Sequence, residues 1–524
     1  MHAPIQIYDT TLRDGTQGEG INLSLHDKLR IAEKLAELGF HYIEGGWPGS
    51  NEKDIAFFEE AKKRDWGACK IAAFGSTRRA NTSVAEDPQV KLLLEAETPA
   101  VTFFGKSWLL HVEQVLRTTA EENRNMIFDT VRYLKDNERE VFYDAEHFFD
   151  GFKDDADYAI MTLKAAAEAG ADCLVLCDTN GGTLASEVYD IVQTVSMTLS
   201  DQKIGIHTHN DCGLGVANAL AAVEAGAVQV QGTMNGFGER TGNCNLTTTI
   251  PILELKMNRP SLPSGHLKQL REVSNFVDEL ANQNHDSRAP FVGLSAFAHK
   301  GGMHVNAVNK TGISYEHIDP DLVGNRQRIL VGELSGRTNV MMKASQLGIS
   351  VEEKSEETKK ILQAVKKLEM EGYEFEAADA SFELLVRRQL GNYTPFFELV
   401  EYHVSLRKND ELHFTNCEGT IKIRIDGKLI HTVANGDGPV NALDEALRKA
   451  LKVKYPEIEQ IHLYDYKVRI INSSAATAAR TRVLIESKDS IDVWGTVGVS
   501  DNVIEASWLA LVDSVEYFLM KQSS

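Results

Sequence analysis

The feature that most constrains the fold is a repeat that runs from Ile5 to about Met257. Each unit has a short apolar, β-branched run, a polar or glycine turn, and a longer stretch with helical periodicity. Eight units can be counted, with strand candidates at 5–11, 42–48, 70–76, 100–106, 140–146, 172–180, 203–211 and 228–236 and helical stretches such as 25–38, 51–63, 113–135, 158–169, 184–199 and 216–225. This alternation predicts a parallel sheet covered by helices.

The number of units favours closure of that sheet. Eight β/α units in about 250 residues are typical of a (β/α)₈ barrel. An open dinucleotide-binding sheet needs a glycine fingerprint after its first strand. Residues 9–17 read DTTLRDGTQ instead, and the glycine-rich run at 236–242 comes too late and has the wrong spacing. The predicted fold class is therefore α/β, with a (β/α)₈ TIM barrel as the catalytic domain over residues 1–260.

The rest of the chain changes character twice. Residues 261–391 are helical and rich in loops, with a highly charged helix expected at 352–371. The segment 290–340 is dense in Gly, His, Asn and Arg, which suits an ordered loop over a site. Residues 392–524 are strand-rich, with helices expected at 440–452 and 503–520 after similar runs, which suggests an internal duplication. We expect a helical accessory subdomain and then a separate C-terminal α+β domain.

Composition narrows the range of partners. The balance of 55 Lys+Arg against 76 Asp+Glu gives a formal net charge of -21, which disfavours binding to nucleic acid or to an anionic membrane. No apolar run approaches the roughly 20 residues of a membrane span, and residues 1–7 show no cationic and then apolar leader. The six cysteines are sparse and lack C-x-x-C spacing, so no disulfide framework is predicted. A cytoplasmic protein is expected.

Candidate metal ligands follow the predicted strands 1, 7 and 8, where barrel enzymes carry their working residues. His207 and His209 share one face of strand 7, because residues i and i+2 of a strand do so, and two imidazoles can then bind one ion. Asp14 can converge on them from strand 1, and Asn243 could add a carbonyl oxygen. Open coordination positions are typical of a catalytic site. The set suits Mg²⁺, Mn²⁺ or Zn²⁺, and the sequence does not choose among them.

Other polar residues at strand ends allow two interpretations each. Arg13 puts a fixed cation beside the predicted metal, which suits an oxyanion or a carboxylate. Alternatively, it forms a salt bridge with Glu146 or Glu44 that only tightens the barrel mouth. Thr179 is either a ligand donor or a cap for the next helix. Strands 7 and 8 do not end in lysine, which disfavours Schiff-base chemistry.

Three motifs resemble the signatures of the DRE-TIM metallolyases: residues 9–17 (DTTLRDGTQ), 207–213 (HTHNDCG) and 238–243 (GERTGN). More narrowly, the chain resembles the isopropylmalate, homocitrate and citramalate synthase branch over nearly its whole length. Its C-terminal part is similar to the leucine- or isoleucine-responsive regulatory domain of that branch. Residues 42–51 (YIEGGWPGSN) and 494–508 (WGTVGVSDNVIEASW) are similar to (R)-citramalate synthases, which favours pyruvate over 2-oxoisovalerate as the acceptor.

The resemblance implies an acyltransferase that joins acetyl-CoA to pyruvate by a Claisen-type condensation. A base removes a methyl proton of acetyl-CoA, the enolate adds to C2 of pyruvate, and hydrolysis of the thioester releases CoA and (R)-citramalate. This would be the first step of a pyruvate route to isoleucine through 2-oxobutanoate. The resemblance also implies a homodimer, and isoleucine is the expected effector.

The resemblance also assigns roles to residues of the barrel. The implied metal ligands are Asp14, His207 and His209, with Asn243 as a further candidate. Arg13 would stabilise the oxygen that becomes an alkoxide, and Thr179 would hold the pyruvate carboxylate. Glu146 matches the carboxylate near the acetyl-CoA methyl group. Tyr143, with Phe103 and Phe104, is expected to line the substrate pocket.

Two further matches lie in the accessory region. His304 and Tyr315 match a His and a Tyr that the branch uses in acid–base steps and that reach the partner's barrel in such dimers. This chain departs from the pattern at Asn306, where some relatives carry an Asp. That change puts a carboxylate role in doubt at this position but leaves the role of His304.

Three alternatives share some of these features. A 2-isopropylmalate or homocitrate synthase would use the same machinery with a longer acceptor, and bulky pocket residues would argue against it. A lyase similar to 3-hydroxy-3-methylglutaryl-CoA lyase would run the chemistry towards cleavage, but such enzymes typically lack the C-terminal regulatory domain. An amino-acid sensor without catalysis would be expected to have lost Arg13, Asp14 or a histidine, and none is lost.

Overall fold

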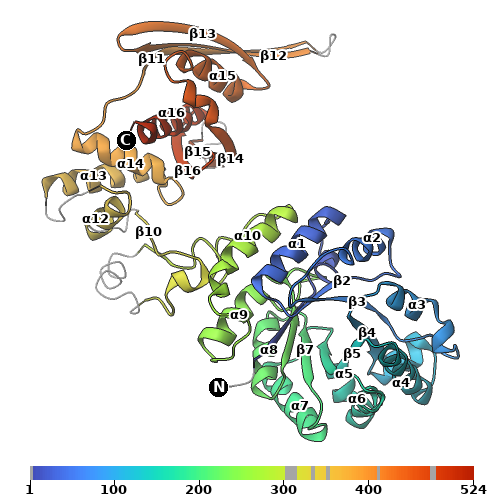
Figure 1. The fold of residues 1–524 in the computed structure, drawn as a ribbon. Helices are drawn as coiled ribbons and strands as arrows, with labels where there is room; N and C mark the ends of the chain where they lie inside the picture. The colour runs from blue at the N-terminus through green and yellow to red at the C-terminus, as the bar shows by residue number, and fades with distance from the viewer. Residues whose placement is uncertain are drawn as a thin grey trace. The chain divides into compact units, whose positions relative to one another are not determined.

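The computed structural model describes residues 4–300, 315–331, 337–349, 355–409, 414–471 and 479–523. The chain divides into two compact units. One comprises Met1–Phe297 with Ile318–Arg326, and the other comprises Ala298–His317 with Gln327–Ser524. Figure 1 shows both units as ribbons. Among the described residues, no helix is both long enough and apolar enough to cross a membrane.

The first unit is built around a closed barrel of eight parallel strands in sequential order. The strands are β1 (Gln6–Asp9), β2 (Tyr42–Gly46), β3 (Lys70–Ser76), β4 (Ala100–Lys106), β5 (Glu140–Glu146), β6 (Cys173–Asp178), β7 (Ile204–Thr208) and β8 (Gln229–Gly232). The ring closes where β8 pairs with β1, with Gln6 opposite Gln229 and Asp9 opposite Gly232. The predicted (β/α)₈ barrel is therefore confirmed.

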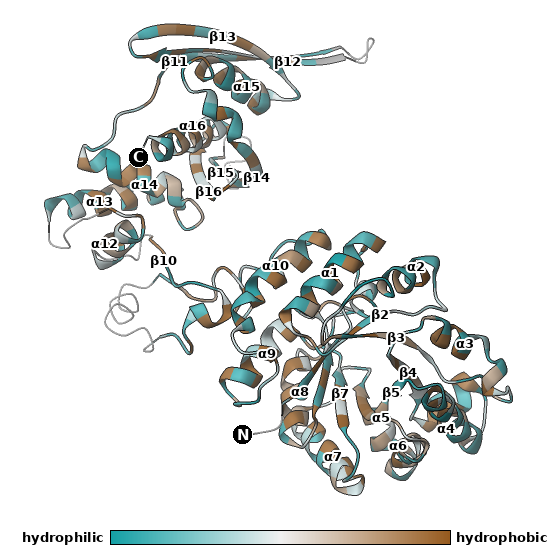
Figure 2. Cartoon of the chain, viewed as in Figure 1, coloured by the Kyte–Doolittle hydropathy of each residue, from teal (hydrophilic) through white to brown (hydrophobic). Residues whose placement is uncertain are grey.

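Helices surround the barrel, as Figure 1 shows. They are α1 (Leu25–Leu38), α2 (Glu52–Ala61), α3 (Pro88–Glu95), α4 (Ala120–Asp136), α5 (Phe148–Asp154), α6 (Ala156–Ala169), α7 (Ala185–Thr198) and α8 (Gly215–Glu224), followed by α9 (Leu246–Leu255) and α10 (Leu270–Leu280). A capping box between Ser24 and Asp27 starts α1, and Gly39 ends it at a φ of 100°. The helices alternate between teal and brown in Figure 2, as amphipathic helices do when one face packs on the sheet.

Strand residues alternate between the two sides of the barrel wall. One buried cluster fills the interior: Tyr8, Tyr42, Ala72, Ala100, Phe142, Cys173, Val175 and Cys177. The rings of Tyr8 and Phe142 meet edge to face there, with centroids 5.7 Å apart. The other side of each strand packs against the helices in a larger cluster that includes Ile7, Ile43 and Val141. The barrel is thus a filled core rather than a pore.

The second unit has a short helical part and two similar sheets. Strands β9 (Ala298–His299) and β10 (Arg328–Ile329) pair, and helices α12 (Arg337–Gln346), α13 (Glu356–Met370) and α14 (Asp379–Leu390) follow. Antiparallel strands β11 (Glu398–Asn409), β12 (Phe414–Ile425) and β13 (Lys428–Gly436) precede α15 (Pro439–Leu451). Strands β14 (His462–Ile470), β15 (Thr481–Lys488) and β16 (Val493–Ser500) precede α16 (Val503–Gln522) in the same order. This repeated order agrees with the suspected duplication.

The region between the barrel and the two sheets is shared by the two units. Val273 and Val277 of α10 belong to the hydrophobic core of the barrel unit. Val340 of α12, Ile361 of α13 and Phe382 of α14 belong to a core of the second unit. The domain boundaries after residues 260 and 391 stay predictions.

Candidate active site

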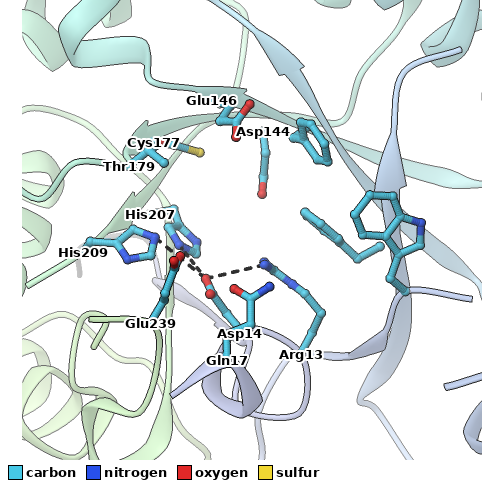
Figure 3. A pocket seen from close by; sticks show the side chains of 13 residues that line it. Arg13, Asp14, Gln17, Asp144, Glu146, Cys177, Thr179, His207, His209 and Glu239 are labelled. Atoms are coloured by element: carbon cyan, nitrogen blue, oxygen red, sulfur yellow. Dashed lines mark ion pairs between the residues drawn. The ribbon is translucent and has the colours of Figure 1, made fainter. Parts of the chain in front are cut away.

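A cavity of about 270 Å³ lies at the carboxyl ends of the barrel strands (Figure 3). It is lined by Arg13, Asp14, Gln17, Trp47, Phe74, Phe104, Asp144, Glu146, Cys177, Thr179, His207, His209 and Glu239. The lining includes three pairs of residues that are two positions apart and therefore share a face of their strand. They are Asp144 and Glu146 of β5, Cys177 and Thr179 at the end of β6, and His207 and His209 at the end of β7. The cavity therefore collects polar side chains from strands that are distant in sequence.

Asp14, His207 and His209 converge on one point at the wall of this cavity. One ligand atom from each residue lies within 4.8 Å of the other two. The Asp14 Oδ2 atom is 3.1 Å from His207 Nε2 and 4.0 Å from His209 Nε2. All three side chains are buried, and Figure 3 shows them turned towards one another. The structure thus brings together three of the four predicted ligands in a geometry that one ion can bridge.

The electrostatic environment favours the metal-binding forms of Asp14 and His209. Burial tends to raise the pKa of Asp14, but Arg13 and His207 hold it well below its ordinary value. Burial and the neighbouring His207 lower the pKa of His209 to about 4. Burial also opposes the charge of His207, yet the hydrogen bond that its Nε2 atom donates to Asp14 raises the pKa of His207 overall. The carboxylate of Asp14 and the neutral imidazole of His209 are therefore the forms that this environment favours.

The ring of His207 is oriented by a side chain behind it. His207 Nδ1 donates to Gln231 Oε1 over 2.9 Å, because an amide oxygen only accepts. Its Nε2 atom is thereby turned towards Asp14. The amide nitrogen of Gln231 donates to Asp144 Oδ1 over 3.2 Å, and burial raises the pKa of Asp144 to about 7. Such partners orient and tune the imidazoles that bind metals.

Asn243, the fourth candidate ligand, leaves an oxygen atom without a partner. Its Nδ2 atom donates to the carbonyl of Phe237, whereas its buried Oδ1 atom has no hydrogen-bond partner in the described part of the chain. The backbones of His209 and Asn243 form an isolated β-bridge. A buried, unsatisfied carbonyl oxygen is costly unless something binds it. Asn243 is not among the residues that line the cavity, so the donor set that fits a divalent metal is the carboxylate and the two imidazoles of Asp14, His207 and His209.

Arg13 is held rigidly at the cavity wall. Its Nε atom donates to Glu44 Oε2 over 2.5 Å, its Nη1 atom is 3.6 Å from Asp14 Oδ2, and its guanidinium lies 3.8 Å from the centroid of the Phe74 ring. Glu44 is fully buried and also accepts from the Tyr8 hydroxyl. Of the two salt bridges considered, the one with Glu44 forms. That salt bridge fixes the guanidinium beside Asp14 while it still lines the cavity.

Glu146 and Thr179 face the same cavity from β5 and the end of β6. Glu146 forms an ion pair with Lys106 of β4. The Thr179 hydroxyl accepts the backbone N–H of His147 over 2.9 Å, which leaves its own hydrogen free to donate into the cavity. Neither contact removes these groups from the cavity lining.

Tyr143 and Phe103 lie outside this cavity. Both side chains are buried in the layer between the barrel wall and the helices, where the Tyr143 hydroxyl contacts Ser107. The reason is the alternation of strand residues, since Asp144 faces inwards and its neighbour Tyr143 must face outwards. Phe104 does line the cavity. The structure therefore does not bring Tyr143 to the pocket in which it was expected.

The structure does not define the positions of His304, Asn306 and Tyr315 relative to the barrel site. His304 and Asn306 lie outside the described residues. Tyr315 belongs to the second unit, where its side chain is 49% exposed. Acid–base roles for His304 and Tyr315 stay predictions.

Sequence reasoning assigned no role to several residues of the cavity wall. Trp47 and Phe74 are two of them, and with Phe104, which was expected at the pocket, they form an aromatic wall in which the Trp47 ring is edge-on to both phenyl rings at centroid distances of 5.9 Å. Gln17 and Glu239 are within the motifs of residues 9–17 and 238–243 but had no role assigned. Cys177 also lines the cavity, and the alternation of strand residues could have predicted this, because Cys177 precedes Thr179 by two positions.

Comparison with known proteins identifies the family. The HMGL-like family model matches residues 4–277, the homocitrate synthase post-HMGL domain-like model matches 291–372, and the LeuA allosteric (dimerisation) domain matches 376–519. The chain is 54% identical to the (R)-citramalate synthase of Aquifex aeolicus, covering 99% of each chain. It is 53% identical to that of Geobacter sulfurreducens, covering 99% of this chain and 98% of the relative. The chain belongs to the (R)-citramalate synthase family.

Relatives that carry the name 2-isopropylmalate synthase are less similar to this chain than the (R)-citramalate synthases are. A probable 2-isopropylmalate synthase of Methanopyrus kandleri is 31% identical over 98% of this chain and 97% of its own length. Membership of the enzyme family, rather than of a group of binding proteins, agrees with the intact set of polar residues in the cavity.

Proposed function

We propose that this chain condenses acetyl-CoA with pyruvate and water to give (R)-citramalate and CoA. The observation that carries the proposal is the meeting of Asp14, His207 and His209 beside the fixed guanidinium of Arg13. Near-full-length identity to (R)-citramalate synthases supports the choice of reaction. We further propose that the enzyme acts in the cytoplasm, at the start of a route from pyruvate to isoleucine.

Asp14, His207 and His209 would hold the divalent metal, with the amide oxygen of Asn243 as a further ligand. When bound, the metal acts as a Lewis acid on the carbonyl of the 2-oxo acid and orients its carboxylate. The open positions that three or four protein ligands leave suit Mg²⁺ or Mn²⁺ as well as Zn²⁺.

The side chains of the cavity supply the remaining steps. The Arg13 guanidinium, fixed by Glu44, donates to the oxygen that gains negative charge when C2 of pyruvate is attacked. The Thr179 hydroxyl donates to the pyruvate carboxylate. Glu146, which forms an ion pair with Lys106, accepts a proton from the acetyl methyl group. The roles of His304 and Tyr315 as acid–base groups are part of the same proposal.

A second cavity suits the CoA moiety. It has a volume of about 300 Å³ and shares Phe104 with the first cavity. Arg78, Arg79 and Lys106 line it, but Arg78 is already paired with Glu122 and Asp129. Lys106 is likewise paired with Glu146, so Arg79 is the lining cation best able to meet an anionic ligand. We propose that the thioester arm passes Lys106 to reach Glu146.

We also propose that isoleucine regulates the enzyme through its C-terminal domain and that the protein is a homodimer. The match to the LeuA allosteric (dimerisation) domain over residues 376–519 supports both points. A 2-isopropylmalate synthase with 2-oxoisovalerate as acceptor is the alternative, and the lower identity to such enzymes argues against it.

The test is CoA release from acetyl-CoA with Mn²⁺ or Mg²⁺, in which pyruvate is compared with 2-oxoisovalerate and 2-oxoglutarate, each with and without isoleucine or leucine. We expect strong preference for pyruvate and inhibition by isoleucine. Preference for 2-oxoisovalerate would indicate a 2-isopropylmalate synthase of leucine biosynthesis instead. No release of CoA with any acceptor would contradict the proposed condensation.

A further inference from the structure

We infer that Trp47 limits the size of the acceptor and that Gln89, outside the cavity, holds Trp47 in place. This inference rests on the proposed condensation with a 2-oxo acid. It concerns the loop between β2 and α2, which supplies only Trp47 to the cavity lining.

The cavity is polar on one side and aromatic on the other. Arg13, Thr179 and a metal held by the Asp14 site would take the oxygen atoms of the acceptor, because they are the cationic, hydrogen-bond-donating and metal-binding groups of the wall. The carbon substituent on C2 then points towards the aromatic wall of Trp47, Phe74 and Phe104. In pyruvate this substituent is a methyl group, and in 2-oxoisovalerate it is an isopropyl group.

Within the aromatic wall, Trp47 has the largest ring and does not come from a strand. Phe74 of β3 is fixed beneath the Arg13 guanidinium at 3.8 Å, and Phe104 of β4 stacks on Phe74 with ring centroids 5.8 Å apart. Trp47 meets both rings edge-on at 5.9 Å. Any space for a larger acceptor on this side must therefore come from a shift of the indole.

Two contacts from outside the cavity oppose such a shift. The indole Nε1 atom donates to Gln89 Oε1 of α3 over 2.9 Å. The backbone N–H of Trp47 donates to Asp54 Oδ2 over 2.9 Å, and the other oxygen of Asp54 accepts from Lys28 Nζ over 2.5 Å. Lys28 and Asp54 are 2% and 7% exposed, so this ion pair is almost fully buried. The ring and the backbone of Trp47 are each held by a polar group.

Two glycines of the loop allow these contacts. Gly46 has a φ of 149°, and a Cβ atom there would lie 2.4 Å from the Asp54 carboxyl carbon. At Gly49 a Cβ atom would lie 2.2 Å from Gln89 Oε1. Side chains at either position would push Asp54 or Gln89 away from Trp47. The glycines of the local sequence GGWPG (residues 45–49) therefore leave the space in which Asp54 and Gln89 contact Trp47.

The expected effect is a loss of selectivity rather than a loss of chemistry. A pocket separates substrates that differ by one methylene by about 10- to 200-fold. We expect Trp47→Leu to reduce the ratio of kcat/KM for pyruvate to that for 2-oxoisovalerate by about 10-fold or more, with 2-oxobutanoate changing less. The kcat with pyruvate should change less than the ratio.

Gln89 is tested separately, because it is a positioning residue. Gln89→Leu removes the acceptor of the indole N–H and should shift the acceptor ratio in the same direction by a smaller factor. Gln89→Glu keeps an oxygen acceptor and should restore the ratio towards that of the wild type. Trp66→Leu is the matched control, because the indole of half-buried Trp66 donates to the Ala61 carbonyl and is not part of the cavity lining.

The experiment combines steady-state CoA release with calorimetric binding of pyruvate and 2-oxoisovalerate to the full-length, Mn²⁺-loaded chain without acetyl-CoA. An unchanged ratio in folded Trp47→Leu, or an equal change in Trp66→Leu, would overturn the inference. If the wild type releases no CoA with any acceptor, the proposed function fails, and the relative binding of the two acids still decides the role of Trp47.

Discussion

Replacement of Gln231 by Leu tests how the barrel prepares His207 to bind a metal. In the wild type, Gln231 accepts from His207 Nδ1 and donates to Asp144 Oδ1. Leucine leaves a buried N–H and a buried carboxyl oxygen without these partners. An unsatisfied buried group costs about 1–3 kcal/mol, and the loss of a partner behind a metal ligand lowers affinity about 10- to 100-fold. We therefore expect Mn²⁺ affinity to fall by about 10- to 100-fold, which equals about 1.4–2.7 kcal/mol.

The control for this change is on the same strand and the same face. Both amide atoms of Gln229 are buried without a hydrogen-bond partner in the described chain. Gln229→Leu should therefore leave Mn²⁺ affinity unchanged and should not lower stability. Affinity is measured by isothermal titration calorimetry on chelated protein. Equal affinities of Gln231→Leu and wild type, or an equal loss in Gln229→Leu, would refute the role assigned to Gln231.

Three further predictions concern other buried groups of the barrel. Arg13→Lys cannot keep the contacts to both Glu44 and Asp14, so kcat should fall by about 10²- to 10³-fold while Mn²⁺ still binds. A kcat close to that of the wild type would contradict the role of Arg13. Asn243→Ala removes the unsatisfied oxygen and should weaken Mn²⁺ binding in calorimetry, and unchanged binding would exclude Asn243 as a ligand. Burial raises the pKa of Asp9 from 3.8 to about 7, so the native state holds a proton that the unfolded chain releases between those values. The stabilisation of the native state by this proton is full below pH 4 and falls by about 4 kcal/mol as the pH rises to 7. Asp9→Asn has no such proton, so the thermal unfolding midpoint of wild type should fall relative to that of the variant between pH 4 and pH 7. Parallel plots of the two midpoints against pH would contradict the raised pKa.

The barrel could be predicted because its signal is local and repeated. The predicted strands at 70–76, 100–106 and 140–146 match β3, β4 and β5 to the residue. Each strand is a short buried run between turns, and eight of them allow few arrangements. At β1, β7 and β8 the predicted strands extend further, because they included the mostly polar residues 10–11, 209–211 and 233–236 of the loops that carry the site.

The site could be predicted only where one strand determines the geometry. His207 and His209 share a face by strand alternation, and the same rule would have turned Tyr143 away once Asp144 was assigned to the interior. The aromatic wall and the contact of Gln89 with Trp47 join residues of different β/α units. Such contacts depend on how the barrel closes, which no local pattern contains.

We propose that the site formed by Asp14, His207 and His209 supports condensation of acetyl-CoA with pyruvate. The most direct measurement is the formation of CoA and (R)-citramalate by chelated protein as Mn²⁺ is added in known equivalents. We expect no product without metal and a rise to full activity as one equivalent per chain binds, with His207→Ala inactive throughout. Full activity in the chelated protein, or in His207→Ala, would contradict it.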